Sequence, residues 1–131
     1  TEHIMGWDIK QNGFGVVLSP ELPSLMRQEL RPALDEFLVR NHLDLDQFEG
    51  FLLHPGGRRV LDTAQDILGL TKDDLGHSWD VLRRYGNMSS VTALFVLENA
   101  IRSGAKGLHL LAAFGPGFSA YFMAVDLHAS R

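Results

Sequence analysis

The sequence predicts one α/β domain, spanning residues 1–131, in which helices pack against a mixed five-stranded sheet. Short apolar runs alternate along the chain with longer segments whose apolar residues recur at helical spacing. Glycine, proline and asparagine mark the borders between the two kinds of segment. The chain has 131 residues, of which 45% are apolar, which is enough for one core and too short for two domains.

The chain begins with a predicted hairpin and a long helix. Apolar runs at 4–9 and 14–18 flank Asn12-Gly13, a dipeptide typical of two-residue hairpin turns. From residue 24 to about 41 the apolar positions recur at helical spacing. Pro32 lies inside this segment, and we expect it to kink or split the helix because it lacks a backbone N–H.

The middle of the chain predicts a strand and two helices. Residues 48–53 are an apolar run that stops at His54, so they predict a buried strand followed by a tight loop. An apolar stripe at 60–68 predicts a helix that ends at Gly69. Another short helix is predicted at 78–85.

The segment 90–103 predicts a helix of unusual character. Between Val91 and Ile101 eight of eleven residues are apolar, and they cover nearly the whole circumference. A helix that is apolar all round is buried on all sides. Because a single α/β layer pair leaves one helix face in water, we expect something outside this chain to cover the rest.

The chain ends in two predicted strands, 108–114 and 118–127, joined by a sharp reversal at Gly115-Pro116-Gly117. Residues 115–120 also match the dinucleotide fingerprint G-x-G-x-x-A. That fingerprint requires a helix next, whereas a strand pattern follows here, so the segment is interpreted as a turn that shapes a pocket.

Composition excludes several classes of protein. There is no cysteine, which excludes disulfides and a thiol nucleophile within this chain. No two of the six histidines fall within five residues of each other, so no metal site is expected. A net charge of −4 gives no attraction to nucleic acid or to anionic membranes. Neither a signal peptide nor an apolar run of about 18 residues is present, so we expect no membrane partner and a cytoplasmic location.

Two loops contain candidate catalytic residues, each with an ordinary structural alternative. His54 stands where a strand ends and is followed by Pro55 and two glycines, a position where α/β sheets bind ligands. Taken alone, His54 is more simply interpreted as a turn residue beside other turn residues. Asn87 precedes a helix, where its amide and free backbone N–H groups could stabilise an oxyanion. The alternative is a plain helix cap by Asn87 or a neighbouring serine.

Three loops together resemble the carboxyl-terminal domain of type III polyketide synthases, the chalcone and stilbene synthase family. They are His54-Pro55-Gly56-Gly57, Tyr85-Gly86-Asn87-Met88-Ser89-Ser90 and Phe114-Gly115-Pro116-Gly117. The resemblance covers essentially the whole chain. It implies a thiolase-like fold, in which two similar halves pack as αβαβα and this chain is the second half. The implied partners are the N-terminal half of the same polypeptide and a second copy in a homodimer.

The resemblance also implies the chemistry. A Cys-His-Asn triad condenses malonyl-coenzyme A with an acyl-coenzyme A starter, with loss of carbon dioxide. His54 and Asn87 take the His and Asn roles, and the cysteine belongs to the half absent from this chain. Coenzyme A thioesters are then the substrates, with no separate cofactor and no metal. The implied substrate-binding residues are Gly56 and Gly57 for the pantetheine arm, Met88 and Ser89 beside the triad, and Phe114, Gly115, Pro116 and Gly117 around the cyclisation cavity.

Two alternatives stay open at this point. A β-ketoacyl carrier-protein synthase III-like enzyme has the same fold and triad, although the loops here favour the polyketide branch. A non-catalytic thiolase-like module, kept for dimerisation or binding, is the second. Under the enzyme interpretation this fragment alone is expected to be inactive.

Overall fold

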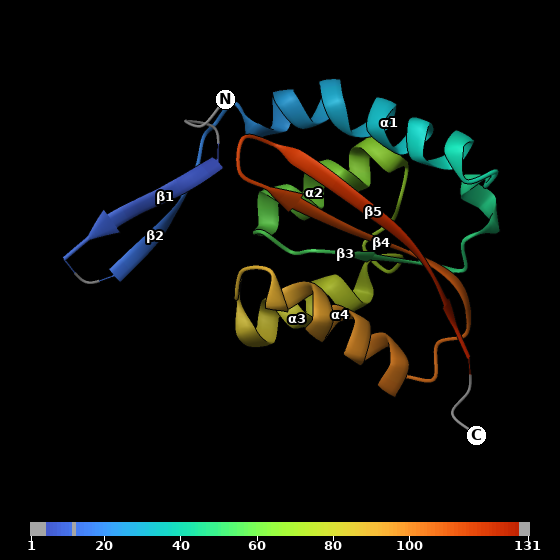
Figure 1. The fold of residues 1–131 in the computed structure, drawn as a ribbon. Coiled ribbons are helices and arrows are strands. Elements are labelled where there is room, and N and C mark those ends of the chain that lie inside the picture. Colours follow the sequence, from blue (N-terminus) through green and yellow to red (C-terminus); the bar gives the residue numbers. More distant parts are fainter. Residues whose placement is uncertain (1–4, 12, 129–131) are drawn as a thin grey trace.

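The computed structural model describes residues 5–11 and 13–128 and confirms the α/β class and the predicted order of elements. Figure 1 shows the arrangement. The elements are β1 (Met5–Lys10), β2 (Gly13–Leu18), α1 (Leu22–Arg40), a 3-10 turn (Leu45–Gln47), β3 (Gly50–Leu53), α2 (Arg58–Leu68), α3 (Gly76–Tyr85), α4 (Val91–Arg102), β4 (Gly107–Gly115) and β5 (Ser119–Leu127).

The five strands form two sheets, which corrects the prediction of a single five-stranded sheet. β1 pairs with β2 in an antiparallel hairpin, which projects away from the layered body (Figure 1). The body contains a three-stranded sheet in the order β3-β4-β5. There β3 is parallel to β4, and β4 is antiparallel to β5, so this sheet is mixed as predicted. A sequence pattern identifies a strand but not the strand edge that it joins.

Gly13 belongs to a strand and not to the turn that the dipeptide predicts. It is the first residue of β2 and lies opposite Lys10 in the ladder. Asn12 itself lies outside the described residues.

Helix α1 runs unbroken through Pro32, so the proline does not split the helix in two. Pro32 lies on the exposed side of the helix. The opposite side has a buried stripe on both sides of the proline, so packing offsets the backbone hydrogen bond that proline cannot make. The stripe consists of Leu22, Met26, Leu30, Leu34 and Leu38.

Helices cover both faces of the three-stranded sheet (Figure 1). Alternate side chains of β4 point to opposite faces, as in any strand. Leu110 and Phe114 enter the core beneath α1 and α2. Leu111 packs on the other face, in the core that α3 and α4 form.

Helix α4 has one buried side and one exposed apolar side. Val96 and Ala100 are fully buried against the sheet. On the outer side Val91 is 43% exposed, Leu94 60% and Ile101 50%. Burial on all sides is therefore not achieved within the described chain, and the outer side is the surface for which a cover is expected. Among residues 5–11 and 13–128, no helix combines the length and apolar character needed to cross a membrane.

Candidate active site

His54 is fixed at the carboxyl end of β3. Its backbone N–H donates to the Ala112 carbonyl of β4 at 2.8 Å, which extends the ladder by one residue. On the other side of β3, the Leu53 N–H donates to the Ser78 hydroxyl at 3.0 Å. Ser78 is fully buried on α3 and His54 is only 8% exposed. The backbone beneath the imidazole is thus held from two directions.

The second loop is a sharp turn between α3 and α4. Gly86 ends α3 with φ of 70°, and Ser89 has φ of 63°, a left-handed conformation that is rare outside glycine. Between them, the Asn87 Oδ1 atom accepts the Ser89 N–H at 2.9 Å. This bond fixes the orientation of the amide, because only oxygen can accept. The expected position of Asn87 just ahead of a helix is confirmed.

Two hydrogen bonds join the loops. The His54 imidazole donates from Nε2 to the Ser89 carbonyl at 2.8 Å. The Asn87 Nδ2 atom donates to the Gly56 carbonyl at 3.2 Å. Because a carbonyl oxygen can only accept, the His54 proton lies on Nε2. The two candidate catalytic side chains, distant in sequence, therefore belong to one hydrogen-bonded cluster.

Burial distinguishes the members of this cluster. His54 is almost wholly covered, whereas Asn87 and Ser89 are exposed. The cluster thus has an anchored side and an open side, as an active site needs if another part of the protein is to reach it.

Gly56 and Gly57, which follow His54, differ in whether the backbone requires glycine at their position. Gly57 has φ of 153°, within the region that L side chains rarely adopt. A Cβ on Gly56 would lie 3.7 Å from His54 Nδ1 and 3.6 Å from Val60 Cγ2, which is ordinary contact. Gly56 therefore lies directly beside the imidazole, and folding alone does not require it to be glycine.

The Phe114–Gly117 turn lies at the same carboxyl edge of the sheet as His54, since β3 and β4 are parallel. A Cβ on Gly115 would lie 2.7 Å from the Ser119 hydroxyl, so the Ser119 side chain would have to rotate to admit one. Phe114 is buried in the core beneath α1 and α2 and stacks on Phe118, with ring centroids 5.8 Å apart. Pro116 is exposed.

Met88 differs from its neighbours in the second loop. Its side chain is half-buried and packs against the core that α3 and α4 form. The hydrogen bonds thus join His54, Gly56, Asn87 and Ser89 into the cluster, while Met88 and Phe114 contribute mainly to the two cores beside it.

The sequence analysis missed two buried hydroxyl residues that support the site. One is Ser78. The other is Thr92, which is fully buried and accepts the Met88 N–H at 2.8 Å. A signal existed for Thr92, because it is a polar residue in the most apolar helical segment of the chain.

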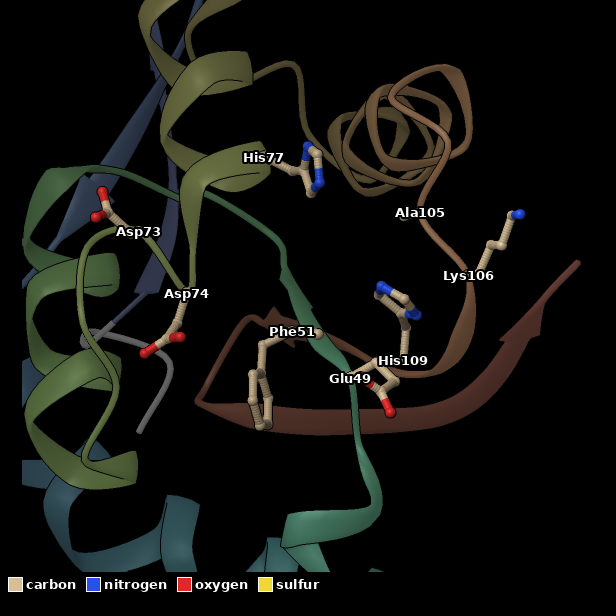
Figure 2. Close-up of a pocket in the computed structure, with 9 residues that line it drawn as sticks. Glu49, Phe51, Asp73, Asp74, His77, Ala105, Lys106 and His109 are labelled. Atoms are coloured by element: carbon tan, nitrogen blue, oxygen red, sulfur yellow. The ribbon is translucent and has the colours of Figure 1, made fainter. Parts of the chain in front are cut away.

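A separate cavity of about 350 Å³ lies at the opposite, amino edge of the sheet (Figure 2). Two imidazoles face it from different elements, His77 on α3 and His109 on β4. His109 donates from Nδ1 to the Gly107 carbonyl at 2.9 Å. Burial, and secondly the neighbouring His109, lower the pKa of His77. The described residues hold no group of three side chains suited to bind a metal ion.

Comparison with protein families gives one match over nearly the whole chain. The family described as "Chalcone and stilbene synthases, C-terminal domain" matches residues 1–126. A putative chalcone synthase of Bacillus subtilis is 37% identical over 122 residues, which cover 91% of this chain and 33% of that protein. The 1,3,6,8-tetrahydroxynaphthalene synthase of Streptomyces peucetius is 38% identical over 126 residues, which cover 94% of this chain and 33% of that protein. The chain thus spans about a third of the length of these relatives.

Solved structures show the same similarity. The 1,3,6,8-tetrahydroxynaphthalene synthase of Streptomyces coelicolor, described as a bacterial type III polyketide synthase, superposes with a TM-score of 0.84 at 30% identity. The match covers 99% of this chain and 38% of that one. CsyB, solved in complex with CoA-SH, superposes with a TM-score of 0.79 at 29% identity, covering 96% of this chain and 37% of that one.

Proposed function

This chain belongs to the chalcone and stilbene synthase family, as its C-terminal domain, and from that premise we propose that it supplies two of three catalytic residues to a type III polyketide synthase. The fold is a thiolase-like half, as the resemblance implies. The proposed reaction joins malonyl-coenzyme A to an acyl-coenzyme A starter with loss of carbon dioxide. The observation that carries the proposal is the cluster in which His54 and Asn87 both bond to Ser89.

The proposed chemistry begins with a cysteine of the N-terminal half. A thiolate next to an imidazolium is a strong nucleophile at neutral pH, so it takes the acyl group from the starter thioester and releases coenzyme A. His54 is the proposed imidazole. Its Nε2–H already faces the Ser89 carbonyl, and a carbonyl oxygen at that position stabilises positive charge on the ring.

The second step is the loss of carbon dioxide from malonyl-coenzyme A. The electrons of the broken C–C bond pass into an enolate, whose oxygen needs hydrogen-bond donors. Asn87 Nδ2 carries two N–H groups, and Gly56 takes one of them. The other is the proposed donor, together with the Nδ1–H that His54 carries as an imidazolium, since its Nε2–H is bonded to the Ser89 carbonyl. The enolate carbon then attacks the acyl thioester, forms the new C–C bond and releases the cysteine thiolate.

Coenzyme A thioesters are the proposed substrates, and no further cofactor is required by these steps. Gly56 lies beside the imidazole with no side chain, which supports passage of the pantetheine arm next to His54. Gly57 continues this stretch of bare backbone. Met88, Ser89 and the turn Phe114–Gly117 are the proposed lining of the cavity around the growing chain.

The proposed partners are the N-terminal half of the same polypeptide and a second copy in a homodimer. The exposed apolar side of α4 supports the first, because a stripe of Val91, Leu94 and Ile101 in water favours burial by another surface. Such an enzyme would act in the cytoplasm, where its coenzyme A substrates are made.

The test uses a polypeptide that contains this domain and a cysteine-bearing N-terminal half. His54→Ala and Asn87→Ala are each expected to lower kcat for malonyl-coenzyme A decarboxylation by about 10²- to 10³-fold, since each removes an enolate donor. His42→Ala and Asn41→Ala, exposed at the end of α1, are matched controls that should leave kcat unchanged. Normal turnover in either active-site variant would remove that residue from the mechanism.

Two further outcomes separate the alternatives. Activity with malonyl groups on an acyl carrier protein but not on coenzyme A would identify a β-ketoacyl carrier-protein synthase III-like enzyme. Binding without any turnover would identify a non-catalytic module. The domain without its N-terminal half should have no synthase activity.

A further inference from the structure

We infer that Thr92 is a positioning residue that aims the Ser89 carbonyl at His54. The catalytic meaning of this inference rests on the proposed function, but the placement of the imidazole can be tested without it. No hydrogen bond joins Thr92 to the imidazole, so the proposed action of Thr92 passes through the loop that it holds.

Thr92 holds the second loop at two points. Its hydroxyl accepts the Met88 N–H at 2.8 Å, and its own backbone N–H donates to the Ser89 carbonyl at 3.0 Å. One residue at the start of α4 therefore bonds to peptide groups before and after Ser89. Thr92 is fully buried, so these bonds are protected from competition by water.

The loop needs this support because Ser89 is in a left-handed conformation, with φ of 63°. Such a conformation is unfavourable for a residue with a Cβ and persists where the surroundings impose it. Asn87 contributes one bond, by accepting the Ser89 N–H. Thr92 contributes the other two, and together they define where the Ser89 carbonyl points.

The Ser89 carbonyl oxygen then accepts two hydrogen bonds, one on each lone pair. Thr92 N–H gives one and His54 Nε2–H gives the other at 2.8 Å. The carbonyl thereby selects the Nε2–H tautomer of His54 and fixes the plane of its ring. If the loop relaxes, the imidazole loses the acceptor that orients it.

Packing alone does not account for a threonine at this position. The other buried residues on this side of α4 are Val96 and Ala100, and valine has nearly the shape of threonine. A valine would fill the same space but leave the Met88 N–H without its acceptor. The Thr92 hydroxyl is therefore explained by its hydrogen bond to the loop and not by packing in the core.

The experiment compares Thr92→Val, Thr92→Ser and Thr63→Val in the polypeptide that contains both halves. Thr63 is a buried threonine of α2, so its replacement controls for the loss of any buried hydroxyl. The first readout is the tautomer of His54, measured by ¹⁵N NMR of the neutral ring. The second is kcat and KM for malonyl-coenzyme A decarboxylation.

Thr92→Val is expected to lower the share of the Nε2–H tautomer and to lower kcat by about 3- to 10-fold, with KM little changed. Thr92→Ser, which keeps the hydroxyl, should restore both readouts. Thr63→Val should move neither.

An unchanged tautomer in Thr92→Val would overturn the inference and leave Thr92 a structural residue. Failure of Thr92→Ser to restore the tautomer would also count against it. A shifted tautomer in a protein whose unmodified form decarboxylates nothing would support the positioning role and contradict the proposed function.

Discussion

His54 and Asn87 both form hydrogen bonds to the backbone of Ser89. The imidazole donates to the Ser89 carbonyl at 2.8 Å, and the Asn87 amide oxygen accepts the Ser89 N–H at 2.9 Å. Neither side chain can be displaced without disturbing the residue that orients the other. The catalytic pair proposed here is therefore coupled through backbone, and substitutions within the loop should affect both members together.

The variants Ser89→Gly and Ser89→Val should differ in their free energy of unfolding. Glycine adopts a φ near 63° without strain, so the loop should survive its introduction. Valine is β-branched and strongly disfavoured in the left-handed conformation. We therefore expect the free energy of unfolding of Ser89→Val to be about 1–2 kcal/mol below that of Ser89→Gly. Chemical denaturation measures this difference, and equal values for the two variants would contradict the left-handed conformation of Ser89.

Gly56→Ala should fold normally but impair substrate binding. The new methyl would make only ordinary contacts, 3.7 Å from His54 Nδ1 and 3.6 Å from Val60 Cγ2. It would project beside the imidazole, where the pantetheine arm is proposed to pass, so KM for malonyl-coenzyme A should rise several-fold. Gly76→Ala, which adds a methyl in open space, is the matched control. An unchanged KM in Gly56→Ala would place the pantetheine arm elsewhere.

Leu94→Glu should reduce self-association of the isolated domain. Leu94 is 60% exposed in the middle of the apolar side of α4, and exposed apolar stripes associate when their natural cover is missing. Sedimentation velocity over a range of concentrations should show oligomers of the unmodified domain and mainly monomers of the variant. Val39→Glu, at a residue 74% exposed on α1, should leave the oligomers intact. An unmodified domain that stays monomeric at every concentration would argue against α4 as a contact surface.

The stability of the domain should fall as the pH drops below 6.5. Burial and the neighbouring His109 lower the pKa of His77 from its ordinary 6.5, while Asp80 opposes the shift. The unfolded chain then binds the proton more readily than the folded one, so stability is greatest above pH 6.5 and declines towards the lower, folded pKa. Asp74 and Asp80 have pKa values lowered from 3.8, so their effect begins only at more acidic pH.

His77→Gln should flatten this decline between pH 6.5 and 3.8, since a glutamine amide can still accept the Asn99 N–H that His77 Nδ1 accepts at 3.2 Å. Urea unfolding at a series of pH values measures the slope. His42→Asn is a suitable control, because His42 is exposed and asparagine tolerates its φ of 53°. If the slope persists unchanged in His77→Gln, another group is responsible for it.

Local signals were sufficient to predict most of the elements. Gly69 ends α2 in a left-handed conformation, as a glycine after the last apolar position predicts. The three loops identified the family before any coordinates because, although each motif is weak alone, their order and spacing along the chain are specific. His54 was located correctly at a strand end for the same local reason.

Non-local pairing accounts for what local signals could not predict. The sequence predicted five strands, but only the tertiary structure divided them between two sheets. A pattern of apolar residues identifies a strand without specifying the strand with which it pairs. Pro32 stays inside α1 because a buried stripe on the far side of the helix packs against the core both before and after the proline.

The sequence by itself determined the element order, the family and the two candidate catalytic residues, because these depend on residue type and spacing along the chain. Only the tertiary structure decided that Ser89 bonds to both of them and that Thr92 lies beneath the loop. Each of these contacts joins a side chain to a backbone group of the loop. Because every residue possesses backbone groups, the sequence does not show which of them a given side chain reaches.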